Sequence, residues 1–204
     1  LSALVAARAA QHLGEREKQQ DWLERARDED PRTAAAALML EAEMLNESGR
    51  FPAALEVLDR LQEQHGRHLA ALRLELRARQ GAGDWNGVLR LVRQLDKREA
   101  LPPEVAREVK LQAHLHILAS QGGDLARLRG YLGTVPAGER SPRLVAAAAR
   151  NLIALAAGGE AQALIEAACD RPDGEGWNAE LVALYGRIEG GELGGRIARA
   201  EDWL

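Results

Sequence analysis

The sequence contains a single cysteine, Cys169, among 204 residues. One cysteine excludes a disulfide within the chain and a metal site built from several of its own thiolates. Aromatic residues are also scarce, at 3% of the chain, whereas hydrophobic residues make up 46%. The core is therefore expected to consist of alanine, leucine and valine, which suits helices packed closely on helices. The predicted fold class is all-α.

Two kinds of segment are missing as well. No apolar stretch approaches the roughly 20 residues of a membrane-spanning helix, and no charged segment followed by an apolar one opens the chain as in a signal peptide. The formal net charge is -4, with 27 basic residues scattered among 31 acidic ones. No net positive field favours a phosphate backbone, so nucleic acid is not an expected partner. Since Leu1 lies inside a predicted helix, we expect a soluble fragment of a longer protein.

The sequence does have a regular spacing of glycines at the ends of apolar helical runs. Intervals of 35, 34, 40, 36 and 32 residues separate Gly14, Gly49, Gly83, Gly123, Gly159 and Gly191. A period of this length is typical of stacked helix-turn-helix repeats, which usually present a binding surface. We predict one α-solenoid of about six repeats over residues 1–204, regular over 1–97 and looser over 102–204.

Capping signals divide each repeat into two helices. Asp30 and Ser141 each precede a proline, and Asp84 is a favourable N-cap residue. The 40-residue interval contains an insertion marked by Pro102 and Pro103. The helices predicted with explicit bounds cover residues 1–13, 15–29, 104–121, 124–132, 142–157, 160–170, 178–189 and 192–204.

The predicted array ends abruptly, on Trp203 and Leu204. A solenoid usually closes with an atypical polar element that covers its last apolar face. We therefore expect the repeats to continue beyond residue 204 in the parent protein, or another chain to cover this end.

Part of this pattern resembles the tetratricopeptide repeat. The resemblance lies in the second helix of the repeat, at Leu23, Ala26 and Pro31 and again at Ala54, Leu58 and Leu61. The first helix lacks the usual tryptophan and Leu-Gly pair, so the repeats are described as degenerate and tetratricopeptide-like.

Longer segments resemble the HemY family encoded in proteobacterial haem-biosynthesis operons. They are residues 6–11, 22–26, 49–61, 72–85 and 180–186, and the resemblance spans most of the chain. It implies two membrane-spanning helices and a basic segment before Leu1, with a tetratricopeptide array facing the cytoplasm at the bacterial inner membrane. It also implies a link to porphyrin metabolism with no established catalytic residue, and we expect no cofactor.

A flavin-dependent oxidase that shares the HemY name is a different protein, and this sequence does not resemble it. Such an enzyme needs a strand followed by Gly-x-Gly-x-x-Gly at a helix N-terminus. Here the glycines of residues 190–195 lie between predicted helices, and no β-branched run precedes them.

In tetratricopeptide folds the first helix of each repeat lines a concave groove. Aligning the glycine turns of this chain predicts which residues occupy that position. They are Arg8, Gln11, His12, Met39, Glu43, Asn46, Arg73, Arg77, Gln80, Lys110 and Ile117.

Within this predicted groove, Arg73 and Arg77 are neighbours at i and i+4, so both guanidinium groups project from one helix face and are able to bind a carboxylate. The alternative is a solvated face whose arginines pair with Glu43 or with local acids. Exposed pairs at the same spacing fit that alternative, namely Glu56 with Arg60 and Glu75 with Arg79.

The histidines and the cysteine offer weaker candidates. His65 and His68 invite a metal or haem interpretation, but no carboxylate or thiolate supports them at a suitable spacing, and we favour residues of a turn. His114 and His116 point in different directions on one helix. Cys169 is expected to be a small buried hydrophobe, and no metal site is predicted.

These observations favour a non-catalytic scaffold for protein–protein interactions, with haem-pathway enzymes as possible partners. The alternative is a tetrapyrrole-binding carrier or regulator that uses the groove or His65 and His68, against which the scarcity of aromatic residues counts. An enzyme comes third, because no acid, base and nucleophile converge in the sequence.

Overall fold

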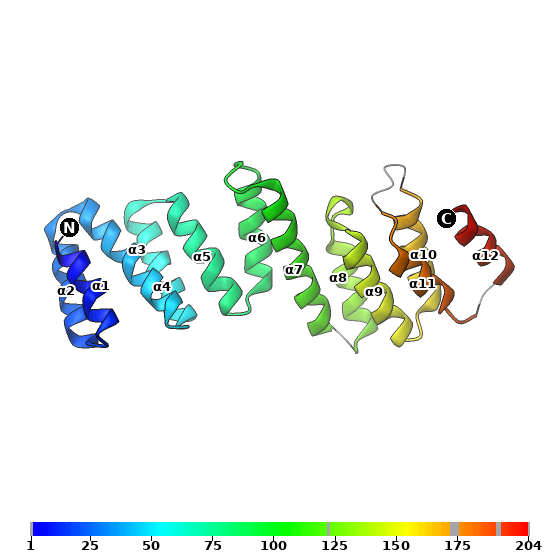
Figure 1. Ribbon diagram of the computed structural model, residues 1–204, viewed down its shortest axis with the longest axis horizontal. Coiled ribbons are helices and arrows are strands. Elements are labelled where there is room, and N and C mark those ends of the chain that lie inside the picture. Colours follow the sequence, from blue (N-terminus) through cyan, green and yellow to red (C-terminus); the bar gives the residue numbers. More distant parts are fainter. Residues whose placement is uncertain (1, 122, 172–175, 191–192, 204) are drawn as a thin grey trace. The chain divides into compact units, whose positions relative to one another are not determined.

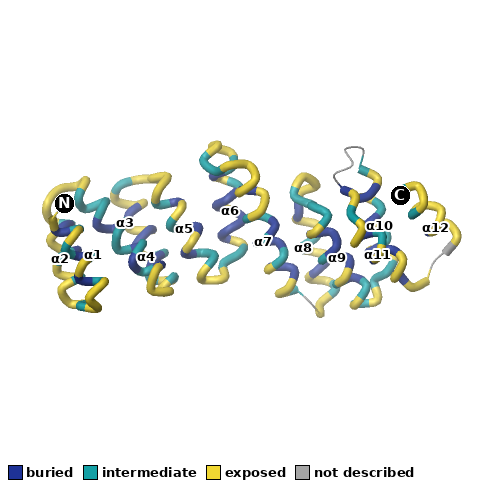
Figure 2. Tube along the Cα trace, in the orientation of Figure 1, coloured by how far each residue is buried: buried dark blue, intermediate teal, exposed yellow. Residues whose placement is uncertain are grey.

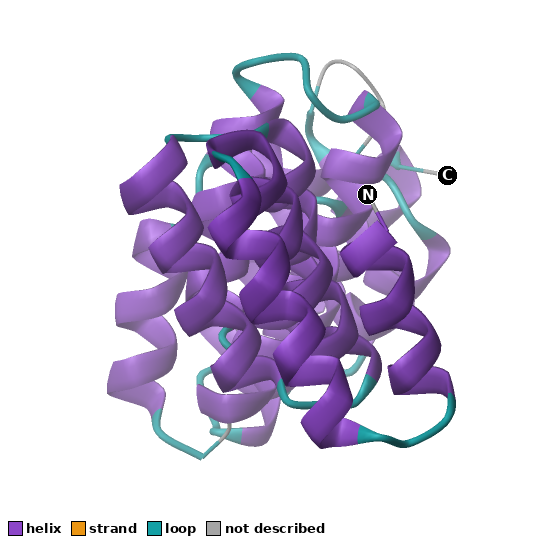
Figure 3. Ribbon diagram, turned by 90° about the vertical axis from the view of Figure 1, so that its left-hand side faces the viewer, coloured by secondary structure: helices purple, strands orange, loops and turns teal. Residues whose placement is uncertain are grey.

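The computed structural model describes residues 2–121, 123–171, 176–190 and 193–203, with only the backbone at Leu193. Every regular element in these ranges is a helix and none is a strand (Figures 1 and 3). This confirms the all-α prediction. None of these helices combines the length and apolar character needed to cross a membrane.

The chain forms two compact units, Leu1–Leu101 and Pro102–Leu204. The division falls at the insertion that Pro102 and Pro103 mark in the sequence.

Alternating helices in two layers build the first unit. Each helix contacts the next along the chain, and α3 also contacts both α1 and α5. Among the described residues of this unit, no two even-numbered helices are in comparable contact. The odd-numbered helices therefore form one closely packed layer, against which the even-numbered helices lie. The elements are α1 (Ser2–His12), α2 (Arg16–Glu29), α3 (Pro31–Glu47), α4 (Phe51–His65), α5 (Leu69–Gly81) and α6 (Trp85–Asp96).

The predicted caps and turns set the helix boundaries here. The Asp30 carboxylate accepts hydrogen bonds from the backbone of Arg32 and Thr33, and Asp84 accepts one from Gly87. The turns at Gly14, Gly49 and Gly83 have φ between 73° and 74°, a left-handed conformation that glycine adopts without steric cost. These caps and turns are confirmed.

Small and branched aliphatic side chains fill the core of the first unit. One cluster joins α1, α2 and α3 around Ala7 and Ala26, and another joins α3 and α4 around Ala42 and Leu61, all with no exposed surface. Figure 2 shows the buried stretches on the sides of these helices that face their neighbours. Alanine at such positions lets helix backbones approach closely, in agreement with the sparse aromatic content.

The second unit repeats the alternation with more irregular connections. Here α9 contacts both α7 and α11, and a short 3₁₀ helix, η1, follows α8. One core cluster runs through the unit, with Leu152, Ile165 and Leu181 near its centre. The elements are α7 (Pro103–Gln121), α8 (Leu125–Thr134), η1 (Ala137–Glu139), α9 (Pro142–Ala154), α10 (Gly158–Cys169), α11 (Ala179–Gly186) and α12 (Leu193–Asp202).

The glycine series holds at Gly123, where φ is 107°, but not at Gly159. Gly159 lies inside α10, and the left-handed residue of the preceding turn is Ala156, with φ 57°. The α9 helix consequently ends at Ala154, earlier than predicted. Gly158 begins α10, and a Cβ atom at this position would lie 3.1 Å from the Ile188 side chain. Glycine here therefore makes room for Ile188 and does not form the turn. Gly191 lies outside the described residues.

At the end where the sequence predicts an apolar face awaiting a cover, Trp203 is partly covered by its own chain. Its ring is half-buried and meets Tyr185 edge-on, with ring centroids 5.0 Å apart, and its Nε1 donates to Asp170 Oδ1 at 2.9 Å. Asp170 follows α10 directly and supplies the acceptor that an indole needs when it is partly buried. Leu204 lies outside the described residues.

Candidate functional site

The predicted groove residues of the first unit all lie on α1, α3 and α5, and we call the exposed surface of these helices the odd-helix face. It is the side of α1, α3 and α5 that is turned away from the even-numbered helices. We describe three parts of this face, at α1 and α3, between α3 and α5, and on α5. They differ in how many of their polar side chains bond to neighbouring residues.

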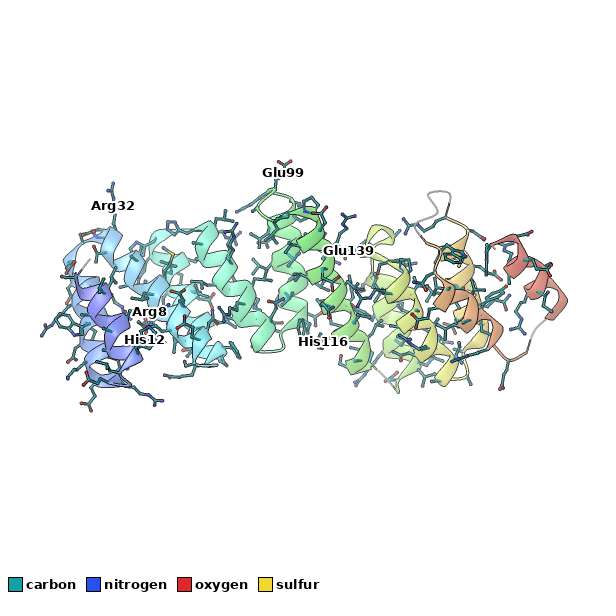
Figure 4. All side chains as sticks on the ribbon, viewed as in Figure 1. Arg8, His12, Arg32, Glu99, His116 and Glu139 are labelled. Atoms are coloured by element: carbon teal, nitrogen blue, oxygen red, sulfur yellow. The ribbon has the colours of Figure 1, made fainter. Side chains whose placement is uncertain are left out.

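Along the seam between α1 and α3, the predicted Arg8 is already engaged (Figure 4). Its guanidinium group donates to both oxygens of Glu47, at 2.8 and 3.0 Å, and lies 3.5 Å from Glu43. Gln11 donates to Glu47 at 3.1 Å. Glu47 was not predicted, although it lies one helical turn beyond Glu43. Two carboxylates therefore offset the single positive charge at this end of the face.

Between α3 and α5, two predicted residues join the helices instead of lining an open groove. Asn46 is only 4% exposed, and its Nδ2 donates to the backbone oxygen of Leu74 at 3.1 Å. Met39 is half-buried and packs against the core cluster of α3 and α4. The expectation that Asn46 lies on open surface is wrong, because its amide bridges the two helices.

On α5 the two arginines remain exposed. Arg73 and Arg77 have no hydrogen bond or ion pair to any other residue that the structure describes. Glu43, their predicted alternative partner, lies near Arg8 instead. Gln80 is half-buried one turn further along, and His12 is exposed on α1. This part of the odd-helix face thus carries two solvated positive charges at i and i+4.

The predicted local ion pairs have different outcomes. Glu75 and Arg79 pair as predicted, with Arg79 Nε donating to Glu75 Oε1 at 2.8 Å. The pair of Glu56 with Arg60 does not occur among the described residues.

In the second unit the groove prediction is wrong for Ile117, whereas Lys110 is partly exposed. Ile117 is 5% exposed, and the Lys110 side chain is 15% exposed with its Nζ 3.8 Å from Glu139 Oε1. The buried residues of α7 fall in two rows, one including Ala113 and Ile117 and the other Leu111 and Leu118. Ile117 belongs to one of these buried rows, so alignment from the glycine turn does not place it on an open surface.

A buried polar network around His114 was missed. His114 is 1% exposed, its Nδ1 lies 2.5 Å from the Tyr131 hydroxyl, and its Nε2 lies 2.9 Å from Glu139 Oε2. A neutral imidazole satisfies both contacts when Nε2–H donates to the carboxylate and Nδ1 accepts from the hydroxyl. The network ties α7 to α8 and η1. No sequence motif marks it, because its members are 17 and 25 residues from His114.

His65, His68 and Cys169 lie where the sequence predicts them to lie. His65 ends α4 and His68 precedes α5, so both belong to a turn. No group of three or more histidine, cysteine, aspartate or glutamate side chains suited to a metal ion occurs in the described part of the chain. Cys169 is buried in the core, where burial, together with the charge of Asp170, raises the pKa of its thiol. A buried thiol with a raised pKa contributes to core packing and is not a reactive nucleophile.

No protein-family model, no curated protein and no solved structure matches this chain.

Proposed function

We propose that this chain is a tetratricopeptide-like repeat scaffold that binds protein partners without catalysing a reaction. The observation that carries the proposal is the pair of exposed arginines, Arg73 and Arg77, on the odd-helix face of the first unit. Repeat proteins usually bind their partners through exposed side chains on the surface of their stacked helices, which is the role proposed for these arginines.

The packing of the helices supports this proposal. Odd-numbered helices contact one another within each unit, whereas even-numbered helices of the described chain do not to a comparable extent. Closer packing on one side of a helix stack bends the stack toward that side, and repeat proteins bind partners on such concave surfaces.

The proposed partner segment is acidic. Two guanidinium groups one helical turn apart suit carboxylates, which they bind through parallel hydrogen bonds. Because Arg8 is offset by Glu43 and Glu47, the acidic segment is expected to cross α5 and not the α1 end of the face.

The resemblance to the HemY family extends the proposal to a pathway and a place. On that basis the protein partners are enzymes of haem and porphyrin biosynthesis. The scaffold would work at the bacterial inner membrane, held there by an N-terminal anchor outside this sequence, with the repeats in the cytoplasm.

The test is partner capture by the parent protein, cross-linked in cells and identified by mass spectrometry. We expect the double variant Arg73→Glu and Arg77→Glu to lose the partners that the unmodified protein captures. The matched control is Arg16→Glu with Arg60→Glu, which changes the net charge equally through exposed arginines of α2 and α4. If both double variants captured the partners equally well, the α5 arginines would not belong to the proposed interface.

A purified partner then gives the affinity. We expect the Arg73 and Arg77 double variant to bind at least roughly tenfold more weakly, since charge-assisted hydrogen bonds contribute more than neutral ones. The binding of the unmodified protein is also expected to weaken with added salt, because the arginines are exposed and screened. Salt-independent binding would contradict an acidic partner segment.

A further inference from the structure

The second unit contains a cleft that is separate from the odd-helix face of the first unit. Its volume is about 360 Å³, within the range of small-molecule sites. The cleft lies among η1, α9 and α10. It is lined by Ala137, Gly138, Arg140, Val145, Leu164, Ala167, Ala168 and Arg171.

The lining of this cleft is apolar apart from two arginines. Its other described side chains are aliphatic or, at Gly138, absent, and no carboxylate is among the lining residues that the structure describes. Small residues on η1 and α10 leave the space open: a Cβ added at Gly138 would meet no atom within 4 Å. Among the described lining residues, the cleft thus combines an apolar wall with two arginines.

The guanidinium group of Arg140 is held in place by backbone groups. Its Nε donates to the carbonyl oxygen of Val135 at 3.2 Å, and its Nη2 donates to that of Leu132 at 3.1 Å. Neither acceptor is a carboxylate, and no ion pair to Arg140 occurs within the described chain. Arg140 therefore keeps its full positive charge in a fixed orientation, which lowers the entropy cost of binding an anion.

A second cleft, of about 340 Å³, shares Gly138, Arg140 and Arg171 with the first. This neighbour is lined by charges of both signs, including Lys110 and Glu139. The two arginines thus stand where the apolar cleft meets a polar one, so a ligand in the apolar cleft would place its charged end at this boundary.

We propose that the apolar cleft binds a free aliphatic monocarboxylate, with its hydrocarbon chain against Leu164 and Ala168 and its carboxylate on Arg140 and Arg171. Burial of the hydrocarbon chain drives binding, and the arginines select the negative charge. A peptide suits the cleft less well. Apart from the arginines, the lining side chains that the structure describes offer no hydrogen-bonding group, so the backbone amides of a peptide would be desolvated without partners.

Decanoate, titrated into the whole chain by isothermal calorimetry below its micelle concentration, is the probe. We expect saturable binding of one molecule per chain. We expect 1-decanol, which has the same hydrocarbon chain and no charge, to bind roughly tenfold more weakly, and decyltrimethylammonium and acetate not to bind measurably. Equal affinity for decanoate and 1-decanol, or no saturable decanoate binding, would overturn the proposal.

The site is tested with a matched pair of variants on α10. Ala167 and Ala163 are both exposed and lie one turn apart, but only Ala167 lines the cleft. Ala167→Leu is expected to abolish decanoate binding by filling the cleft, whereas Ala163→Leu leaves it unchanged. Both variants should keep their helical circular dichroism, since neither position belongs to the core. Decanoate binding that survives Ala167→Leu would place the ligand elsewhere and reject this cleft.

The charge requirement is tested separately at Arg171. Arg171→Gln is expected to weaken decanoate binding roughly tenfold and to leave 1-decanol binding as it was. This variant spares Arg140, whose bonds to the carbonyl groups of Leu132 and Val135 contribute to the fold. An equal loss for both ligands would contradict recognition of the carboxylate.

Discussion

At the scale of single residues, Tyr185 shows how a buried polar atom is satisfied in this alanine- and leucine-rich core. Its hydroxyl group donates to Glu166 Oε1 at 2.5 Å, and Gln162 donates to the same oxygen at 2.9 Å. Burial, together with the hydrogen bond and charge of Glu166, raises the pKa of Tyr185 from 10.0 to about 12. The folded state therefore favours the neutral phenol.

The expected consequence is a loss of stability at alkaline pH. The unfolded chain releases the phenol proton near pH 10, whereas the folded chain holds it until about pH 12. Between these values the unfolded state binds fewer protons, so the free energy of unfolding falls as the pH rises. Urea denaturation across this pH range should show that the free energy of unfolding falls. The fall should be smaller for Tyr185→Phe.

Absorbance of tyrosinate gives the control for this prediction. The chain has two tyrosines, and the Tyr185→Phe spectrum identifies which titration belongs to residue 185. A Tyr185 that ionises near pH 10 in the folded protein would contradict the bond to Glu166.

At the scale of the element, the start of α6 shows how one carboxylate positions a helix. Asp84 accepts from the backbone of Gly87 at 2.9 Å and from Arg79 Nη1 at 2.6 Å. A Cβ at Gly87 would lie 2.1 Å from the Asp84 carboxylate and 2.7 Å from Arg79. Only glycine at this position allows the cap and the ion pair together. Burial opposes ionisation of Asp84, but these partners outweigh it and lower its pKa.

Removal of this cap should destabilise the helix start. We expect Asp84→Ala to lower the free energy of unfolding by about 1 kcal/mol, because the Gly87 amide loses its acceptor. Asp84→Asn keeps an acceptor and should cost less. Urea denaturation of the two variants and the unmodified chain measures both effects.

The pH dependence of the Asp84 variants follows from the lowered pKa. The ionised carboxylate stabilises the fold fully above the unfolded value near 3.8, and this contribution is lost as the pH falls through the lower folded value. The stability difference between the unmodified chain and Asp84→Asn should therefore shrink below about pH 4. A difference that grows in acid would contradict the assigned cap.

At the scale of the whole molecule, each of the two units has a core of its own. The clusters around Ala7 and Leu61 lie entirely within residues 1–101, and that around Ile165 lies within residues 102–204. The two units are thus expected to fold without requiring each other.

A fragment of residues 1–101 tests this expectation. We expect it to keep helical circular dichroism and to unfold in one cooperative urea transition, because α1 to α6 contact one another in sequence order. A fragment of residues 1–83 is the control, and it should be less stable, since it lacks α6 and leaves α5 covered by α3 and α4 alone. An unstructured 1–101 fragment would show that the units depend on each other.

Much of the fold was predictable because its signals are local. Asp30, Asp84 and Ser141 begin helices as predicted, and glycines end them, since capping depends on residues within one turn. Gly159 misled the prediction because it lies inside α10, and Ala156 takes the left-handed conformation of the preceding turn. In the same way, the alignment of turns found the exposed Arg73 and Arg77 but misplaced Ile117, which is buried by contacts that no local signal records.

The sequence by itself determined the all-helical class, the helix starts and the two solvated arginines of α5, because these depend on spacing along one helix. Tertiary structure alone decided which polar side chains bond to residues of other elements. The Glu47 bond of Arg8, the Asn46 bridge, the His114 network and the unneutralised Arg140 all join residues from separate elements. Packing of separate helices brings such groups within hydrogen-bond distance, and no periodicity in the chain encodes that approach.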